Sequence, residues 1–208
     1  MNTDTLNRFA AAGAATVYEA YGRKGDVNPA IRRISSSRQI AGPAYCVGCA
    51  IGDNLALHRA VAEASAGDIL VVAGHGAEYG YLGDILAEAA MARGIAGIVV
   101  DGSVRDAAEL IRMDFPVWAR GLAIRGATKN QPGSIGEPID CGGIRVANGD
   151  IVVADDDGVA IVERADVSQV ATGMNARLEQ EVAMRDALRQ GALTLDLLSL
   201  RSYISAAR

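Results

Sequence analysis

Three charged residues near the middle of the chain, Asp84, Arg105 and Asp106, have the types and the spacing of a functional group. Two carboxylates supply the hard oxygen ligands that Mg²⁺ prefers, and a guanidinium binds carboxylates or stabilises developing negative charge. Asp84 stands at the expected start of a helix, where free backbone N–H groups favour an anion. The combination predicts an anion-binding cradle beside two carboxylates that can hold a divalent cation.

The elements expected around these residues bring them to one edge of a sheet. Residues 68–74, "DILVVAG", and 94–100, "GIAGIVV", are typical of strands buried on both faces. A glycine-rich loop and a helix over 84–94 connect them, and a Gly-Ser turn at 101–105 leads into a helix near 105–113. Alternating strands and helices indicate right-handed parallel crossovers, and ligands bind beyond the carboxyl ends of such strands. Glycines of the first loop would let the backbone approach a ligand closely: Gly74, Gly76, Gly80 and Gly83.

The rest of the chain adds three groups of expected elements. A helix over 5–21, a strand over 39–48 and a helix over 52–68 capped by Asp53 or Asn54 come first, and residues 116–122 form a later strand. From Pro138, short apolar runs separated by Gly-Gly, Asn-Gly and Asp-Gly predict hairpins. A long helix over 165–189 follows, with an apolar tail. We expect one α/β domain over 1–164, and a segment over 165–208 that packs on a neighbouring subunit.

Composition narrows the class of protein. The chain has 208 residues, half of them hydrophobic, and a net charge of −5, so it shows no electrostatic footprint for nucleic acid or for an anionic membrane. No apolar run approaches the length of a membrane span, and the first residues lack the pattern of a secretory leader. We therefore expect a cytoplasmic protein. Three cysteines, with Cys46 and Cys49 in a strand-like context, are expected to be small core residues.

Other chemistries find less support. The only lysines, Lys24 and Lys129, lie in loop-like sequence, and a Schiff-base lysine needs a desolvated pocket. The cluster "DDDG" at 155–158 resembles a metal site, but a hairpin turn explains it better. Of the two histidines, His58 is expected to pack on a helix, while His75 sits in the glycine-rich loop and is a candidate pocket residue. Two histidines give little support to a Ser-His-Asp arrangement.

Two long stretches resemble a known family. Residues 80–121, "GYLGDILAEAAMARGIAGIVVDGSVRDAAELIRMDFPVWARG", and 149–162, "GDIVVADDDGVAIV", are similar to the 4-hydroxy-4-methyl-2-oxoglutarate / 4-carboxy-4-hydroxy-2-oxoadipate aldolases. These belong to the superfamily named after the regulator of ribonuclease E activity. The resemblance covers about 15–200. It implies an α/β fold: a layered α/β/β/α swivelling-type domain with parallel strand–helix crossovers, C-terminal β-hairpins and a long C-terminal helix, assembled as a homotrimer or homohexamer.

The resemblance also implies roles for individual residues. Asp106 would bind a divalent metal directly, and Asp84 would hold metal-bound water. Arg105 would bind the pyruvyl oxygens, and Gly83, Ile85 and Leu86 would form the turn whose amides hold the substrate carboxylate. A glutamate from the C-terminal helix of the adjacent subunit would complete the catalytic group, with Glu181 the first choice and Glu179 the alternative.

The activity implied is a lyase reaction. A 4-hydroxy-2-oxo di- or tricarboxylic acid would be cleaved through a pyruvate enolate to pyruvate and an oxo acid, with Mg²⁺ or Mn²⁺ as cofactor and oxaloacetate decarboxylation as a side activity. Two alternatives stay open: a metal-enolate enzyme acting on another oxo acid, and a non-catalytic binding protein of the ribonuclease E regulator type. The acidic residue after the arginine, absent from members that bind ribonuclease E, favours the metal-dependent branch.

Overall fold

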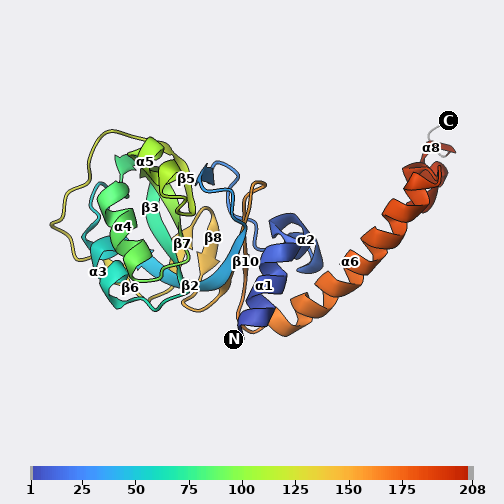
Figure 1. The fold of residues 1–208 in the computed structure, drawn as a ribbon, viewed down its shortest axis with the longest axis horizontal. Helices are drawn as coiled ribbons and strands as arrows, with labels where there is room; N and C mark the ends of the chain where they lie inside the picture. The colour runs from blue at the N-terminus through green and yellow to red at the C-terminus, as the bar shows by residue number, and fades with distance from the viewer. Residues whose placement is uncertain (1, 206–208) are drawn as a thin grey trace.

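The computed structural model describes residues 2–205 and is built around a mixed sheet (Figure 1). Its core strands are parallel and lie in the order β5-β4-β3-β2. The strands are β2 (Ile40–Gly48), β3 (Ile69–Gly80), β4 (Gly97–Val104) and β5 (Val117–Leu122). Three helices connect them in turn, α3 (Leu55–Glu63), α4 (Asp84–Ala92) and α5 (Ala107–Arg112). The predicted strand–helix crossovers are confirmed.

A second layer of strands is joined to the first through β2. Residues Ile40–Pro43 of β2 pair antiparallel with β9, whereas Ala44–Gly48 pair parallel with β3. The further strands are β1 (Arg32–Ser35) on β5, β6 (Ser134–Ile135) on β2, the hairpin β7 (Ile139–Cys141) and β8 (Ile144–Val146), and the hairpin β9 (Ile151–Ala154) and β10 (Val159–Val162). The predicted C-terminal hairpins are confirmed, whereas the short strands β1 and β6 were not predicted.

Three apolar clusters lie between successive layers of helices and strands and pack these layers together. One cluster packs α3, α4 and α5 against the first face of the parallel strands. A second lies between the other face and the hairpin strands, with Trp118 and Cys141 fully buried in it. A third packs β9 and β10 against α1 (Thr3–Ala12), α2 (Ala14–Ala20) and the start of α6 (Val167–Arg189). These clusters make the α/β/β/α layering that was expected.

Several element boundaries differ from those expected. The strand predicted to end at residue 74 continues to Gly80 as β3, so the glycine-rich loop is largely strand with a shifted register. The predicted Gly-Ser turn after residue 100 is wrong, because Gly102 and Ser103 lie in β4 and pair with neighbouring strands. The predicted helix over 5–21 is broken at Gly13, whose φ of 82° is left-handed.

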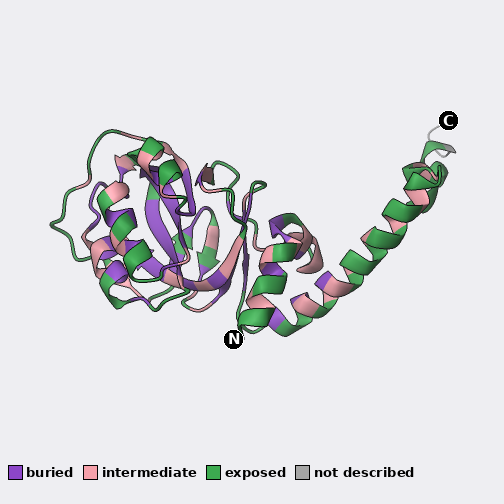
Figure 2. Ribbon diagram, viewed as in Figure 1, coloured by how far each residue is buried: buried purple, intermediate pink, exposed green. Residues whose placement is uncertain are grey.

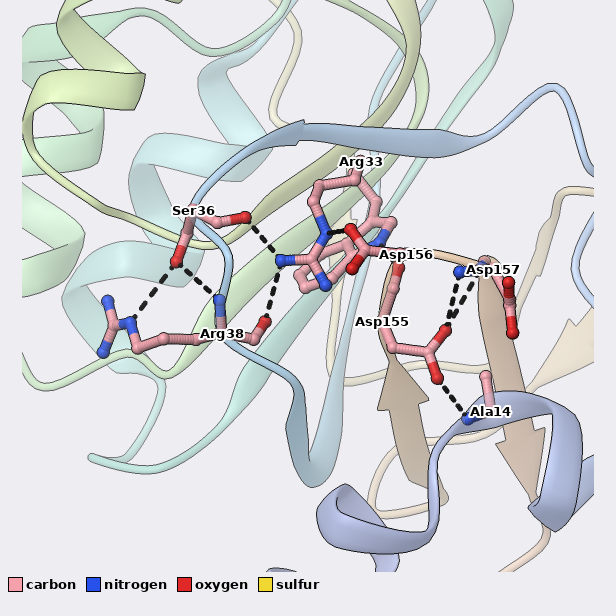
Figure 3. Close-up of polar contacts among 9 residues, drawn as sticks. Ala14, Arg33, Ser36, Arg38, Asp155, Asp156 and Asp157 are labelled. Atoms are coloured by element: carbon pink, nitrogen blue, oxygen red, sulfur yellow. Dashed lines mark hydrogen bonds and ion pairs between the residues drawn. The ribbon is translucent and has the colours of Figure 1, made fainter. Parts of the chain in front are cut away.

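The acidic run at 155–158 is the turn between β9 and β10, as predicted (Figure 3). Asp155 is buried, and its carboxylate accepts hydrogen bonds from the backbone amides of Ala14, Asp157 and Gly158. Asp156 forms an ion pair with Arg33, 2.7 Å away. Asp155 therefore joins the hairpin to the N-terminal helices, and the run has a structural role.

The cysteines are core residues, as predicted. Cys46, Cys49 and Cys141 are buried and unlinked by disulfides. Burial raises the pKa of each thiol to about 12. Thiolate chemistry at neutral pH is therefore disfavoured at all three positions.

The C-terminal helix α6 projects from the body of the subunit (Figure 1). Only Val167, Val170 and Met174 near its start are buried, and the remainder is mostly exposed (Figure 2). Two short helices follow, α7 (Thr194–Leu197) and α8 (Arg201–Ser205). The expected division at 164/165 stays a prediction. Across residues 2–205, no helix combines the length and apolarity needed to cross a membrane.

Candidate active site

Arg105 and Asp106 mark the end of β4 and the entry to α5. The amide of Arg105 donates to Leu82 O at 2.9 Å, which ties this point to the residues before α4. Asp106 caps α5 with φ 57° and ψ 38°, a left-handed conformation that costs energy for a residue with a Cβ. This conformation places Asp106 Oδ2 at 3.4 Å from Arg105 Nε. Two side chains that are adjacent in sequence therefore face the same site.

Asp84 reaches the same site from the start of α4. Its backbone amide donates to Asp106 Oδ2 at 3.3 Å, and its own Oδ1 accepts from the amide of Ile85 at 2.7 Å. The Asp106 carboxylate thus contacts both Arg105 and the start of α4 through Oδ2. Sequence reasoning thus brought Asp84, Arg105 and Asp106 together correctly. A substrate carboxylate at the Ile85 amide would replace the Asp84 carboxylate there.

The glycines near the site make room for side chains. A Cβ on Gly83 would collide with Asp106 Oδ2, and one on Gly80 would lie 3.1 Å from Arg105 Cδ. Gly126, from the loop after β5, approaches Arg105 in the same way. Of the other glycines expected to approach a ligand, Gly74 packs on the Tyr81 ring and Gly76 faces Arg120. Gly80 and Gly83 thus accommodate Arg105 and Asp106, whereas Gly74 and Gly76 accommodate other side chains. The predicted close approach of these glycines to a ligand stays a prediction.

A cavity of about 240 Å³ opens beside Arg105. This volume suits a small metabolite, since sites for drug-sized ligands begin at roughly 300 Å³. The cavity is lined by Asn54, His58, Gly80, Gly83, Asp84, Ile85, Leu86, Arg105, Ala127 and Lys129. A second cavity shares Arg105 and includes Asp106, Leu122, Ala123 and Ile124. Arg105 therefore lines both cavities.

Three polar lining residues were not assigned to the site from sequence. Lys129 lines the cavity but is exposed, which agrees with the expectation that neither lysine has the desolvated pocket that a Schiff base needs. His58 lies on α3 but also faces the cavity, and Asn54 lies at the start of the same helix. Asn54 Nδ2 donates to Tyr81 O, while its buried Oδ1 has no hydrogen-bond partner among the described residues. An unsatisfied buried acceptor in a cavity indicates a place for a donor.

His75 and Glu181 do not join this cavity. His75 Nε2 lies 3.1 Å from Cys49 O, and His75 is not one of the residues that line the cavity, contrary to its expected place there. Glu181 lies on the projecting helix α6, where it forms ion pairs with Arg177 and Arg185 at 3.1 and 3.0 Å. In its own subunit α6 extends away from α4 and α5 (Figure 1). A role for Glu181 in the site would therefore have to be played in a different subunit.

The sequence of this chain matches a family model and a named relative. The sequence model of the RraA-like family, described as Aldolase/RraA, matches residues 14–161. The chain therefore belongs to the RraA-like family. It is 32% identical, over 97% of its length and 94% of the relative, to a Halalkalibacterium halodurans protein provisionally named 4-hydroxy-4-methyl-2-oxoglutarate aldolase.

Solved structures share the fold. Streptomyces coelicolor RraAS2, described as an unusual member of the RNase ES inhibitor RraA protein family, matches with a TM-score of 0.81 and 26% identity, covering 89% of this chain and 98% of its own. An uncharacterized Pseudomonas syringae pv. tomato protein matches with a TM-score of 0.83 over 93% of this chain and 96% of its own. At 23% identity, that second likeness concerns the fold alone.

Proposed function

We propose that this protein is a divalent-metal-dependent aldolase that cleaves 4-hydroxy-2-oxo acids and releases pyruvate. The observation that carries the proposal is the meeting of Asp84, Arg105 and Asp106, through the 3.4 Å and 3.3 Å contacts of Asp106 Oδ2, beside a cavity that Asp84 and Arg105 line. The name of the Halalkalibacterium relative supports the substrate class. Oxaloacetate decarboxylation is proposed as a side activity because it leads to the same enolate.

The residues present fit a hard cation. The carboxylate of Asp106 contacts the backbone amide of Asp84 through Oδ2, and the side chain of Asp84 adds a second carboxylate beside it. The absence of a Cβ at Gly83 keeps the space beside Asp106 open. We assign Asp106 as the direct ligand and Asp84 as the holder of coordinated water, a set that suits Mg²⁺ or Mn²⁺. When bound, such an ion supplies Lewis acidity toward the 2-oxo carboxylate end of the substrate.

The side chains of the chain itself account for the remaining chemistry. Asp84, together with Glu181 of a neighbouring subunit, would accept the C4 hydroxyl proton through water. The C3–C4 bond then breaks, C4 becomes the carbonyl carbon of the departing oxo acid, and its electrons pass to the pyruvyl fragment. The Arg105 guanidinium stabilises the negative charge that develops on the 2-oxo oxygen. A proton added at C3 completes pyruvate.

The assembly is part of the proposal. Apolar residues remain exposed along the C-terminal segment, namely Leu178, Val182, Leu193, Leu197, Leu198, Leu200, Tyr203 and Ile204. Exposed apolar surface on a projecting helix favours contact with another subunit. We propose a closed homotrimer or a dimer of trimers in which α6 brings Glu181, or else Glu179, to the neighbour's site.

The test is pyruvate release from 4-hydroxy-4-methyl-2-oxoglutarate, coupled to lactate dehydrogenase. We expect turnover with added Mg²⁺ or Mn²⁺, none after EDTA treatment, and recovery when the metal is returned. Each cleaved molecule yields two of pyruvate, because both fragments of this substrate are pyruvate. Full activity after exhaustive chelation would refute the metal dependence. No turnover on any 4-hydroxy-2-oxo acid, together with binding to a ribonuclease E-type protein, would favour a regulatory role instead.

A further inference from the structure

The loop over residues 123–130, which follows β5, forms one wall of the cavity beside Arg105. Ala127 and Lys129 of this loop line the cavity. Gly126 lies against the Arg105 guanidinium, since a Cβ added there would stand 3.2 Å from Nη1. A guanidinium stabilises a developing charge only from the right position, so whatever holds this loop also determines where Arg105 acts.

Backbone hydrogen bonds fix the first half of the loop. The Ala123 amide donates to Val104 O at 2.9 Å, and the Gly80 amide donates to Arg125 O at 2.7 Å. These contacts join the loop to the ends of β4 and β3. They involve no side chain, so most substitutions would leave them in place.

The second half of the loop is attached to a buried side chain as well as to the backbone. The Thr128 amide donates to Gly52 O at 2.8 Å. Asp53 is 2% exposed, and its Oδ2 accepts hydrogen bonds from the Thr128 hydroxyl at 2.7 Å and the Asn130 amide at 2.6 Å. Burial alone would raise the pKa of Asp53, but these hydrogen bonds and one from the Leu55 amide hold it at about 2. An ionised carboxylate therefore joins the loop to the start of α3.

We propose that Asp53 is a positioning residue for Arg105: its carboxylate holds the 123–130 loop, and the loop holds the guanidinium. Asp53 is not one of the residues that line either cavity at Arg105, so it acts through the loop and not on the substrate. This inference rests on the proposed function, because it names a residue on which the chemistry at Arg105 depends. It does not depend on which oxo acid is cleaved.

A double-mutant cycle on Asp53 and Arg105 tests the proposal. Asp53→Asn replaces the charged acceptor by an amide of the same shape. It should lower kcat for pyruvate release by about 10-fold, since a misplacement of about 1 Å can cost up to 100-fold. In an Arg105→Lys background the same substitution should change kcat by less than about 2-fold, because no guanidinium remains to be positioned. Equal losses in the two backgrounds, or an unchanged kcat in Asp53→Asn alone, would overturn the proposal.

The chain offers a matched control in Asp150. This carboxylate is also buried, and it accepts hydrogen bonds from the amides of Ala147 and Arg164 at 2.8 and 3.0 Å. It lies directly before β9 and lines neither cavity at Arg105. Asp150→Asn should lower the thermal stability, as Asp53→Asn does, but leave kcat at the wild-type value. An equal loss of kcat in both variants would overturn the proposal, because general destabilisation would then account for it.

Thr128→Val provides a second, milder variant in case Asp53→Asn folds poorly. It removes one donor to the Asp53 carboxylate and keeps the shape of a β-branched side chain. We expect kcat to fall by about 3-fold, the scale of one neutral hydrogen bond, and to stay unchanged when the same substitution is made in Arg105→Lys. Additive losses in this cycle would overturn the proposal in the same way.

A chemical measurement separates this inference from the proposed function. Phenylglyoxal modifies arginine side chains, and peptide mass spectrometry can follow the rate at Arg105 without any turnover. In Asp53→Asn the guanidinium should leave its place against Gly126 and react several-fold faster. Arg93, at the other end of α4, is the internal reference and should keep its rate.

The two results distinguish the two claims. Faster modification of Arg105 in Asp53→Asn, without pyruvate release from any oxo acid by the wild type, would support the positioning role while refuting the aldolase function. An unchanged rate at Arg105 would refute the positioning role even in an active aldolase.

Discussion

The Asp106 carboxylate lies 3.4 Å from Arg105 Nε, and the left-handed backbone of Asp106 makes this contact between sequence neighbours possible. In an extended strand, consecutive side chains point to opposite faces. The turn in the backbone at residue 106 brings both to the same site. The contact between Arg105 and Asp106 therefore depends on their position between the end of β4 and the start of α5, and a substitution at either residue would disrupt it.

Arg105→Lys should lower kcat by about 100-fold or more, the scale of losing one donor to a developing oxyanion. A lysine retains the charge but cannot reproduce the planar fork of the guanidinium. Asp106→Ala should abolish metal-dependent turnover altogether. The measurement is steady-state pyruvate release, with circular dichroism to confirm folding. Near-normal turnover in Arg105→Lys would mean that the residue is structural.

Gly83→Ala should reduce turnover with little loss of stability. Gly83 has φ −134°, which alanine adopts freely, but the added Cβ would collide with Asp106 Oδ2. A shift of the carboxylate by about 1 Å can cost up to 100-fold in rate. Gly121→Ala is the matched control, because a Cβ there meets nothing within 4 Å. Thermal melts measure the stability of both variants, and steady-state kinetics measure their turnover. Equal activities of the two variants would contradict the role of Gly83 in leaving space for the Asp106 carboxylate.

Stability should fall in acid because of Asp53. Its pKa is about 2 in the folded protein, below the ordinary value of 3.8. A lowered folded-state pKa contributes stability above pH 4, and this contribution is lost as the pH falls from about 4 toward 2. Urea unfolding across this range should show the loss, and Asp53→Asn should flatten that part of the curve. An unchanged slope in the variant would show that other carboxylates dominate.

Lys129→Met should raise the pKa of His58. Burial is the larger cause of its lowered pKa, so the value should recover only in part when the lysine charge is removed. Charged groups lining the same cavity, Asp84 and Arg105, stay in place. NMR titration can follow the two imidazoles of the chain separately. A His58 titration that does not respond would place Lys129 too far away to act beside it.

Mixed oligomers should reveal a site shared between subunits. Arg105→Ala chains and Glu181→Ala chains should each be poorly active alone. After co-refolding, some sites would combine an intact Arg105 with an intact Glu181, and part of the activity should return. The same mixture made with Glu179→Ala chains distinguishes the two candidate glutamates. Mixed assemblies no more active than their parents, despite verified subunit exchange, would refute the shared site.

The sequence predicted those parts of the fold that depend on local pattern. Periodic apolar runs identified β2 to β5 and their connecting helices, and turn residues identified the hairpins. The predicted ends of β3 and β4 were wrong because glycine is common in turns, and the glycines there were interpreted as turn residues. At Gly102, however, glycine lies within a strand because a side chain would collide with the ring of Tyr81. That contact joins residues distant in sequence, and no local pattern contains it.

The sequence predicted only those site residues that lie between a strand and the helix after it. Asp84, Arg105 and Asp106 lie at element boundaries, so topology alone brought them to one edge. Lys129 lies seven residues beyond the end of β5 at Leu122, and its place depends on Asp53 at the start of a different helix. The signal that could have found it was the buried Asp53 beside Asn54, which had been considered only as a helix cap.

Strand β2 has a consequence for how the molecule loses its structure. Its first residues pair with β9 and its last with β3, so a single continuous backbone takes part in both sheets. Opening of the β9–β10 hairpin would free one half of β2 and weaken the other half. Amide protons in both layers should therefore exchange with solvent in one cooperative event. A substitution in the remote hairpin would then lower the fraction of molecules with an intact catalytic edge, without touching any group that meets the substrate.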